Sequence, residues 1–300
     1  MNLCDVQTVK KIMAKFSTGT KKSFGQNFLI NEEVPYSIAR ESYEYHKSSN
    51  GQKKSAVIEI GPGIGSLTSE LCRVYDKVIA VEIDKTLIPV LEYTLGEFDN
   101  LKIINDDFLK LDLAELLNTE LDGYDVSVCA NLPYYITTPI IMALLENARG
   151  ESGASRFTSI TVMVQKEVAL RLSANETKSD YGAITASINY YGEVKKLFDV
   201  GPENFLPAPK VTSSVVRIEL YKEPKYKVES EKMLFSVIQG AFLQRRKTLL
   251  NSLSSAFNHI SKEKISEAIE ACGFDLTIRG ERLSISDFCR LSDAFSNISK

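Results

Sequence analysis

The four consecutive residues from Asn131 to Tyr134 combine groups that suit chemistry on a flat, nitrogen-bearing ring. An exocyclic adenine amine is a poor nucleophile, because its lone pair is delocalised into the ring. The Asn131 side-chain oxygen and the Leu132 carbonyl, whose residue Pro133 restrains, are two acceptors for its N–H bonds. Tyr134 can stack on the base and hold it for in-line attack. The motif predicts alkylation of an adenine extruded from a nucleic acid, whereas taken alone it also fits an ordinary turn with a packed tyrosine.

A glycine-rich turn from Gly61 to Gly65 could bring a cofactor to this chemistry. Glycines such as Gly61 and Gly63 allow the backbone to approach a ligand closely. Glu82 stands at the end of the next predicted strand, where a carboxylate can accept hydrogen bonds from a ribose diol. Asp107 ends the third strand and can meet an adenine amino group. The Gly-x-Gly-x-Gly spacing differs from that of dinucleotide-binding proteins, which disfavours NAD.

The elements that position these residues alternate between strands and helices. Short, nearly continuous apolar runs predict strands buried on both faces, at residues 56–60, 78–83, 101–105, 126–130 and 159–165. Helical stretches separate them at residues 66–75, 85–96, 111–118 and 139–147. This order predicts an α/β fold with a parallel sheet between helices, and it places the candidate residues at the carboxyl ends of strands.

The C-terminal part of the chain has a different pattern. Three more strands are predicted at residues 186–191, 194–200 and 214–220, and helical periodicity then runs from residue 230 to 258. Ser261 is expected to cap a helix that ends before Gly273, and Ser286 to cap the last helix. We therefore predict a first domain at 1–222, with a basic segment at 1–25, and a smaller all-helical domain at 223–300.

Composition restricts the class of protein. The 300 residues carry a formal net charge of −3, so any contact with RNA must come from local basic patches. Five cysteines without Cys-x-x-Cys spacing and only two histidines support neither a disulfide scaffold nor a zinc site. No apolar run approaches the ~20 residues that span a bilayer, and the first residues do not resemble a secretion signal. We expect a cytoplasmic protein that makes no contact with a membrane and holds no metal.

Several motifs together resemble the ribosomal RNA adenine dimethyltransferase family over nearly the whole chain. These motifs are Phe24–Leu29, the Gly61 turn, Val81–Asp84, Asp107, Asn131–Tyr134, Phe205–Val211 and Gln244–Leu249. Within the family, the chain looks most like the bacterial enzymes that dimethylate two adjacent adenosines near the 3′ end of small-subunit ribosomal RNA. The resemblance implies a Rossmann-like class I methyltransferase sheet with S-adenosylmethionine (SAM) as methyl donor and no metal.

The resemblance also assigns expected roles to residues. The expected donor-binding residues are Asn27, Leu29, Gly61, Gly63, Glu82, Asp107 and Asn131. The expected catalytic residues, which surround the target base, are Asn131, Leu132, Pro133, Tyr134 and Phe205. Phe205 belongs to a loop that helps to enclose the flipped base. We name no general base, since the amine becomes acidic as it is alkylated.

Basic residues complete the expected site. The candidates for contact with RNA phosphates are Lys21, Lys22, Lys210, Arg245, Arg246 and Lys247. The last three are predicted on a helix of the second domain, which we expect to bind RNA or the ribosome. The expected partner is the small ribosomal subunit or its RNA, met on an assembly intermediate by a monomeric enzyme. For any single lysine, a solvated surface position is the alternative.

Other functions compatible with these motifs remain open at this point. A large-subunit ribosomal RNA adenine methyltransferase of the macrolide-resistance type shares the fold, the donor and the chemistry. Tyr134, the Pro207–Val211 stretch and the predicted helix with Arg245–Lys247 favour the small-subunit enzyme. A catalytically silent nucleic-acid-binding relative is a second alternative, against which the intact Asn131–Tyr134 motif argues. A DNA adenine methyltransferase is disfavoured, because its usual motif is Asp-Pro-Pro-Tyr.

Overall fold

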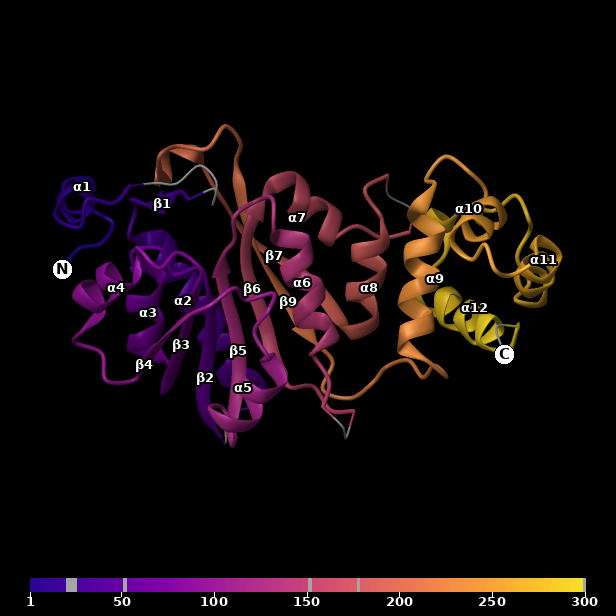
Figure 1. Ribbon diagram of the computed structural model, residues 1–300, viewed down its shortest axis with the longest axis horizontal. Coiled ribbons are helices and arrows are strands. Elements are labelled where there is room, and N and C mark those ends of the chain that lie inside the picture. The colour runs from indigo at the N-terminus through magenta and orange to yellow at the C-terminus, as the bar shows by residue number, and fades with distance from the viewer. Residues whose placement is uncertain (20–25, 51–52, 151–152, 177–178, 299–300) are drawn as a thin grey trace. The chain divides into compact units, whose positions relative to one another are not determined.

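The computed structural model describes residues 1–19, 26–50, 53–150, 153–176 and 179–298 (Figure 1). The chain divides into two compact units. The first comprises Met1–Ala169 and Val194–Lys222, and the second comprises Leu170–Glu193 and Glu223–Lys300. The sequence predicts a single domain boundary, after residue 222. The structure differs in that residues 170–193 belong to the second unit.

A mixed sheet forms the centre of the first unit. In the described part of the chain, seven strands join in the order β4-β3-β2-β5-β6-β9-β7. Their bounds are β2 (Lys54–Ile60), β3 (Lys77–Glu82), β4 (Leu101–Asn105), β5 (Tyr124–Asn131), β6 (Phe157–Gln165), β7 (Gly192–Val200) and β9 (Ser213–Leu220). The strands from β4 to β6 in that order are parallel, and β9 is antiparallel to β6. The predicted α/β, Rossmann-like fold is therefore confirmed.

Helices precede and connect these strands. Their bounds are α1 (Val6–Lys15), α2 (Glu33–Asn50), α3 (Ser66–Val74), α4 (Ile88–Leu95), α5 (Leu113–Thr119), α6 (Thr137–Glu146) and α7 (Lys166–Leu172). Pro89 lies in the first turn of α4. Backbone N–H groups in the first turn make no hydrogen bond within the helix, so the absence of an N–H in proline costs nothing there. The α4 helix therefore begins three residues later than predicted. The α2 and α3 helices pack against each other and share a buried core with the sheet.

A strand predicted at residues 186–191 is wrong, because this segment forms the helix α8 (Ala183–Tyr191). The α8 helix packs against helices of the second unit, and most of its side chains are buried. A short apolar segment that is buried nearly all round has no clear period, so its sequence does not distinguish a buried strand from a buried helix. Tyr190 and Tyr191 are core residues, and their hydroxyls donate to the Glu231 carboxylate at 3.0 and 3.1 Å.

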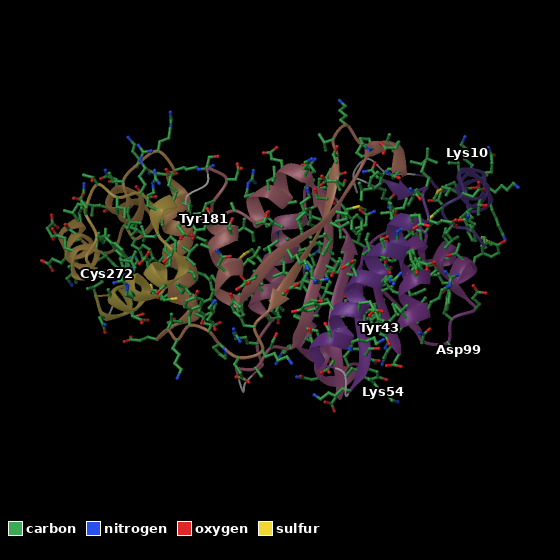
Figure 2. All side chains as sticks on the ribbon, turned by 180° about the vertical axis from the view of Figure 1, so that it is seen from behind. Lys10, Tyr43, Lys54, Asp99, Tyr181 and Cys272 are labelled. Carbon is green, nitrogen blue, oxygen red and sulfur yellow. The ribbon has the colours of Figure 1, made fainter. Side chains whose placement is uncertain are left out.

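The second unit is helical, as predicted. Besides α8 it contains α9 (Glu231–Leu243), α10 (Leu249–Ala256), α11 (Lys262–Ala271) and α12 (Ile285–Ile298). Buried aromatic rings connect these helices, and the hydroxyl of Tyr181, labelled in Figure 2, donates to the Leu283 carbonyl at 3.0 Å. Ser261 caps α11 as predicted.

Two details of the second unit differ from the prediction. The helical stretch over residues 230–258 is interrupted at residues 244–248, because Thr248 leaves the helical conformation and caps α10 through the Asn251 N–H. The predicted Ser286 cap of α12 is also wrong. Ser284 and Asp287 form a reciprocal pair there, in which each backbone N–H donates to the side-chain oxygen of the other residue.

Two short strands bring distant segments beside the main sheet. The β1 strand (Phe28–Leu29) pairs antiparallel with β8 (Phe205–Leu206), which places Leu29 opposite Phe205. The Ile30 N–H also donates to the Asn204 carbonyl at 2.9 Å. This pairing holds two predicted site segments together although 176 positions separate them in sequence. Among the described helices, none is long and apolar enough to cross a membrane.

Candidate active site

One cavity lies at the carboxyl ends of β2, β3 and β5, between these strands and the β1–β8 pair. Because parallel strands end at the same edge of a sheet, the loops that follow them converge there. The cavity is lined by Asn27, Leu29, Gly61, Gly63, Glu82, Asp107, Asn131, Leu132, Pro133, Tyr134 and Phe205. The structure therefore brings every predicted catalytic and donor-binding residue to one place.

The glycine turn between β2 and α3 exposes its backbone to the cavity. Gly61 and Gly63 have φ angles of +70° and +63°, which L side chains rarely adopt. A Cβ at Gly61 would meet nothing within 4 Å, so open space lies beside the backbone there. A Cβ at Gly63 would lie 3.3 Å from the Phe28 ring of β1. The turn can thus admit a ligand at Gly61 and pack against the β1 segment at Gly63.

Glu82, the last residue of β3, is buried and hydrogen-bonded to two neighbouring loops. One carboxylate oxygen accepts from the Asp84 N–H at 2.8 Å, and the other accepts from the Gly63 N–H at 3.3 Å. Burial raises the pKa of Glu82, and the two N–H donors oppose that rise. The carboxylate is therefore held rigidly beside the glycine turn, where it can accept hydrogen bonds from a ligand diol.

Asp107 lies beyond the end of β4 and is less buried than Glu82. Its Oδ1 accepts from the Leu109 N–H at 3.1 Å, and its Oδ2 lies 3.4 Å from the Lys110 ammonium. The preceding Asn105 side chain donates to the Glu82 carbonyl at 2.7 Å and ties this loop to β3. The loop can present the Asp107 carboxylate to a polar group in the cavity.

Hydrogen bonds hold the Asn131–Tyr134 motif in place. The Asn131 amide group donates to the Asn27 carbonyl at 3.4 Å, which leaves Oδ1 as the acceptor of that side chain. The Ile136 N–H donates to the Pro133 carbonyl at 3.1 Å and closes a turn before α6. The Tyr134 hydroxyl is 2.8 Å from the Ser213 hydroxyl of β9. Backbone and side chains together hold an acceptor and an aromatic ring at the same end of the cavity.

Glu59 is a cavity residue that the sequence analysis missed. It lies inside β2 and is only 1% exposed, and its Oε2 has no hydrogen-bond partner among the described residues. Burial, with a smaller contribution from the charge of Glu82, raises its pKa to about 8. The neighbouring Thr68 side chain opposes that rise. The available signal was an acidic residue within an otherwise apolar buried strand. A buried carboxylate oxygen that lacks a hydrogen bond is a position that a donor group of a ligand can occupy.

The predicted basic residues that the structure describes do not line this cavity. Lys210 is exposed in the loop before β9, and Lys21 and Lys22 are not among the described residues. Arg245, Arg246 and Lys247 are exposed, but their predicted helical location is wrong. They occupy the turn between α9 and α10, which the Lys247 N–H closes by donating to the Gln244 carbonyl at 2.8 Å.

Two further arginines lie beside this turn in the second unit. The Leu249 N–H donates to the Ile278 carbonyl at 2.7 Å, which brings the following loop against the turn. Glu281 lies 4.0 Å from both Arg245 and Arg279. Arg279 and Arg282 are exposed. The sequence analysis missed these two residues because 33 positions separate residues 246 and 279, and only the fold brings them together.

The comparisons with known proteins agree with this arrangement. The sequence model of the family described as ribosomal RNA adenine dimethylase matches residues 18–296. The chain is 42% identical to "Ribosomal RNA small subunit methyltransferase A" of Alkaliphilus metalliredigens over 94% of both chains. It is 43% identical to the protein of the same name from Lachnoclostridium phytofermentans over 97% of both chains.

Solved structures show the same fold. A dimethyladenosine transferase from Plasmodium falciparum matches with a TM-score of 0.67 and 24% identity, over 86% of this chain and 96% of that one. The 23S rRNA methyltransferase ErmE matches with a TM-score of 0.61 and 22% identity, over 91% of this chain and 100% of that one. At these identities, the two matches establish the fold alone.

Proposed function

Because the chain belongs to the ribosomal RNA adenine dimethylase family, we propose that it dimethylates two adjacent adenosines near the 3′ end of small-subunit ribosomal RNA, with SAM as methyl donor. The chain is a methyltransferase that acts on ribosomal RNA. The choice of the small subunit is supported by relatives at 42% and 43% identity whose names specify that subunit. We further propose that it acts as a monomer on an assembly intermediate of this subunit.

The main support for this proposal is that the residues expected to bind the methyl donor and the residues expected to bind the target base line the same cavity. We assign Gly61, Glu82 and Asp107 to a first half-site, for the donor, and Asn131 and Tyr134 to a second, for the base, and all five residues line the cavity. The first half-site offers acceptors for a ribose and an adenine amino group. The second offers an amide acceptor beside an aromatic ring, which suits a purine amine. A nucleoside donor and a nucleobase acceptor can therefore meet within one enclosure.

The residues of the first half fit SAM, which supplies an electrophilic methyl group when bound. We assign the ribose diol to Glu82, the adenine amino group to Asp107 and the glycine turn to the methionine part. Glu59 can accept a hydrogen bond from the ammonium group of that part, which would satisfy its unpaired Oε2. Asn27 and Leu29 close the cavity from the β1 side.

The residues of the second half act by orientation. Asn131 Oδ1 and the Leu132 carbonyl accept from the two N–H bonds of the target amine and direct its lone pair out of the ring plane. Tyr134 stacks on the base, and its hydroxyl bond to Ser213 fixes the ring position. Phe205, brought close by its pairing with Leu29, covers the base. The amine proton becomes acidic as the new bond to carbon forms, so water can remove it without a protein base.

The substrate RNA needs cations outside the cavity. We propose that the exposed turn Arg245–Lys247, together with Arg279 and Arg282, contacts RNA phosphates, and that Lys210 contributes from the first unit. Glu281 lies 4.0 Å from both Arg245 and Arg279, so these two cations lie near each other on the surface of the second unit. A net charge of −3 keeps this attraction local and favours a shaped ribosomal surface over arbitrary RNA.

Incubation of the protein with labelled SAM and undermethylated small ribosomal subunits tests this function. We expect label in N6,N6-dimethyladenosine at two adjacent positions near the 3′ end of the small-subunit RNA. Undermethylated large subunits, incubated in parallel, should remain unlabelled. Label confined to the large subunit would assign the macrolide-resistance activity instead, and binding without label would indicate a catalytically silent protein.

Replacing Glu82 by alanine should weaken the binding of SAM by roughly 10- to 150-fold. The reason is that a buried hydrogen bond to a charged group contributes about 1.5–3 kcal/mol. Isothermal calorimetry measures the affinity, and thermal unfolding checks that the variant is folded. Exposed Glu97 provides a control, since Glu97→Ala removes a carboxylate outside the cavity. An unchanged affinity in the Glu82→Ala variant would refute its contact with the ribose.

A further inference from the structure

Tyr135 presents an exposed aromatic ring at the mouth of the cavity. It is 63% exposed and lines the same cavity as its neighbour Tyr134. Ile83 and Leu109 are the other strongly exposed large apolar side chains of the cavity lining, at 48% and 41%. Isolated exposed apolar side chains are common on proteins, whereas three around one cavity indicate a surface that a ligand covers.

The three residues belong to different parts of the cavity. Ile83 follows Glu82 and Leu109 follows Asp107 by two positions, so both flank the part that we assign to SAM. Tyr135 follows the Asn131–Tyr134 motif, which we assign to the target base. The group that covers the Tyr135 ring should therefore belong to the RNA substrate and not to SAM.

The backbone of Tyr135 is held in place although its ring is not. The turn closed by the Ile136 N–H and the Pro133 carbonyl at 3.1 Å, followed at once by α6, fixes the Cα position. Within the described residues, the Tyr135 side chain makes no hydrogen bond and no ring contact. Tyr134, by contrast, is bonded to Ser213. An aromatic ring that is attached to a fixed backbone, and that has no partner among the described residues, is suited to stack on an external group.

We propose that Tyr135 stacks on the base next to the target adenosine while the target occupies the pocket beside Tyr134. This inference rests on the proposed function. Extruding one base from a stacked strand removes a stacking partner from its neighbour, and an aromatic ring at the cavity mouth replaces it. A purine offers a larger ring surface than a pyrimidine, so Tyr135 favours a purine beside the target adenosine.

Steady-state methyl transfer to undermethylated small subunits tests the energetic part of this inference. Tyr135→Ala should lower kcat/KM for the subunit by about tenfold or more, within the roughly 5- to 150-fold range of one base–aromatic stack. Tyr135→Phe and Tyr135→Trp keep the ring and should stay within about twofold of the wild type. The affinity for SAM should be unchanged in all three variants. Tyr36→Ala, which removes an exposed tyrosine from α2, is the matched control.

A fluorescent substrate distinguishes stacking from a structural role. The base on one side of the target, and in a second substrate the base on the other side, is replaced by 2-aminopurine, whose fluorescence falls when it stacks. We expect the fluorescence of one of the two substrates to fall when it binds the wild type, Tyr135→Phe or Tyr36→Ala. It should not fall on binding to Tyr135→Ala.

Two outcomes would overturn the stacking role. One is a Tyr135→Ala variant with wild-type kcat/KM, and the other is equal quenching by Tyr135→Ala and the wild type. Failure of the proposed function has a different signature, because the wild-type protein itself would then methylate no small subunits.

Discussion

Tyr134→Ala is expected to lower the kcat of methyl transfer by at least about 100-fold while the affinity for SAM changes less than twofold. The tyrosine ring is the group that would hold the target base in the plane required for attack, and a misplacement of about 1 Å in such a site can cost that factor. The Glu59, Glu82 and Asp107 part of the cavity does not depend on this ring. Single-turnover kinetics on undermethylated subunits and calorimetry with SAM measure the two quantities separately.

The bond between Tyr134 and Ser213 provides an internal control. Tyr134→Phe keeps the ring but loses the hydroxyl, so we expect about a 3- to 10-fold loss, the contribution of one hydrogen bond. Ser213→Ala should cause a similar loss, and the double variant should be no worse than either single one. If Tyr134→Ala were as active as Tyr134→Phe, the stacking role would be refuted.

Glu59→Gln is expected to change how the stability of the SAM-free protein depends on pH. The pKa of Glu59 is about 8 in the folded protein, against 4.5 for an ordinary glutamate, so the folded state keeps a proton that the unfolded state has lost. The free energy of unfolding of the wild type should therefore fall between about pH 4.5 and pH 8, by up to ~1.4 kcal/mol per pH unit from this group. Glu59→Gln lacks this contribution. Its free energy of unfolding, measured relative to that of the wild type, should therefore increase as the pH rises to 8.

Urea unfolding at pH 6, 7 and 8 measures this difference. Glu97→Gln, at an exposed position, should follow the wild type throughout. Parallel curves for Glu59→Gln and the wild type would show that Glu59 ionises normally in the folded state. The same group should affect SAM, because its carboxylate form binds a cation. Wild-type affinity for SAM should rise by up to about tenfold between pH 6 and pH 7, and that of Glu59→Gln should not.

Local sequence signals were sufficient where a residue's role follows from its own strand or turn. The buried strands, the glycine turn and the residues at strand ends were predictable, because parallel strands must end at a common edge. Gly61, Glu82, Asp107 and Asn131 line one cavity for this reason. The Ser261 cap of α11 follows an equally local pattern.

Local sequence patterns gave wrong predictions in two situations. In one, complete burial removes the hydrophobic periodicity of a helix, and in the other, a capping residue interrupts a helix that the periodicity predicts to continue. The segment at 186–191 was predicted as a strand because a helix buried nearly all round has no polar face. The interruption at residues 244–248 depends on Thr248 capping α10, which the apolar period does not reveal. For this reason Arg245–Lys247 lie in a turn and not on a helix.

The sequence by itself determined which functional groups the site contains: an acceptor-rich motif, a glycine turn and carboxylates placed at strand ends. Only the tertiary structure decided which distant segments meet. The β1–β8 pairing sets Leu29 opposite Phe205, and the sheet buries Glu59 with its Oε2 unpaired among the described residues. Such effects depend on contacts between residues far apart in the chain, and on the loss of water around a charge, neither of which a local pattern records.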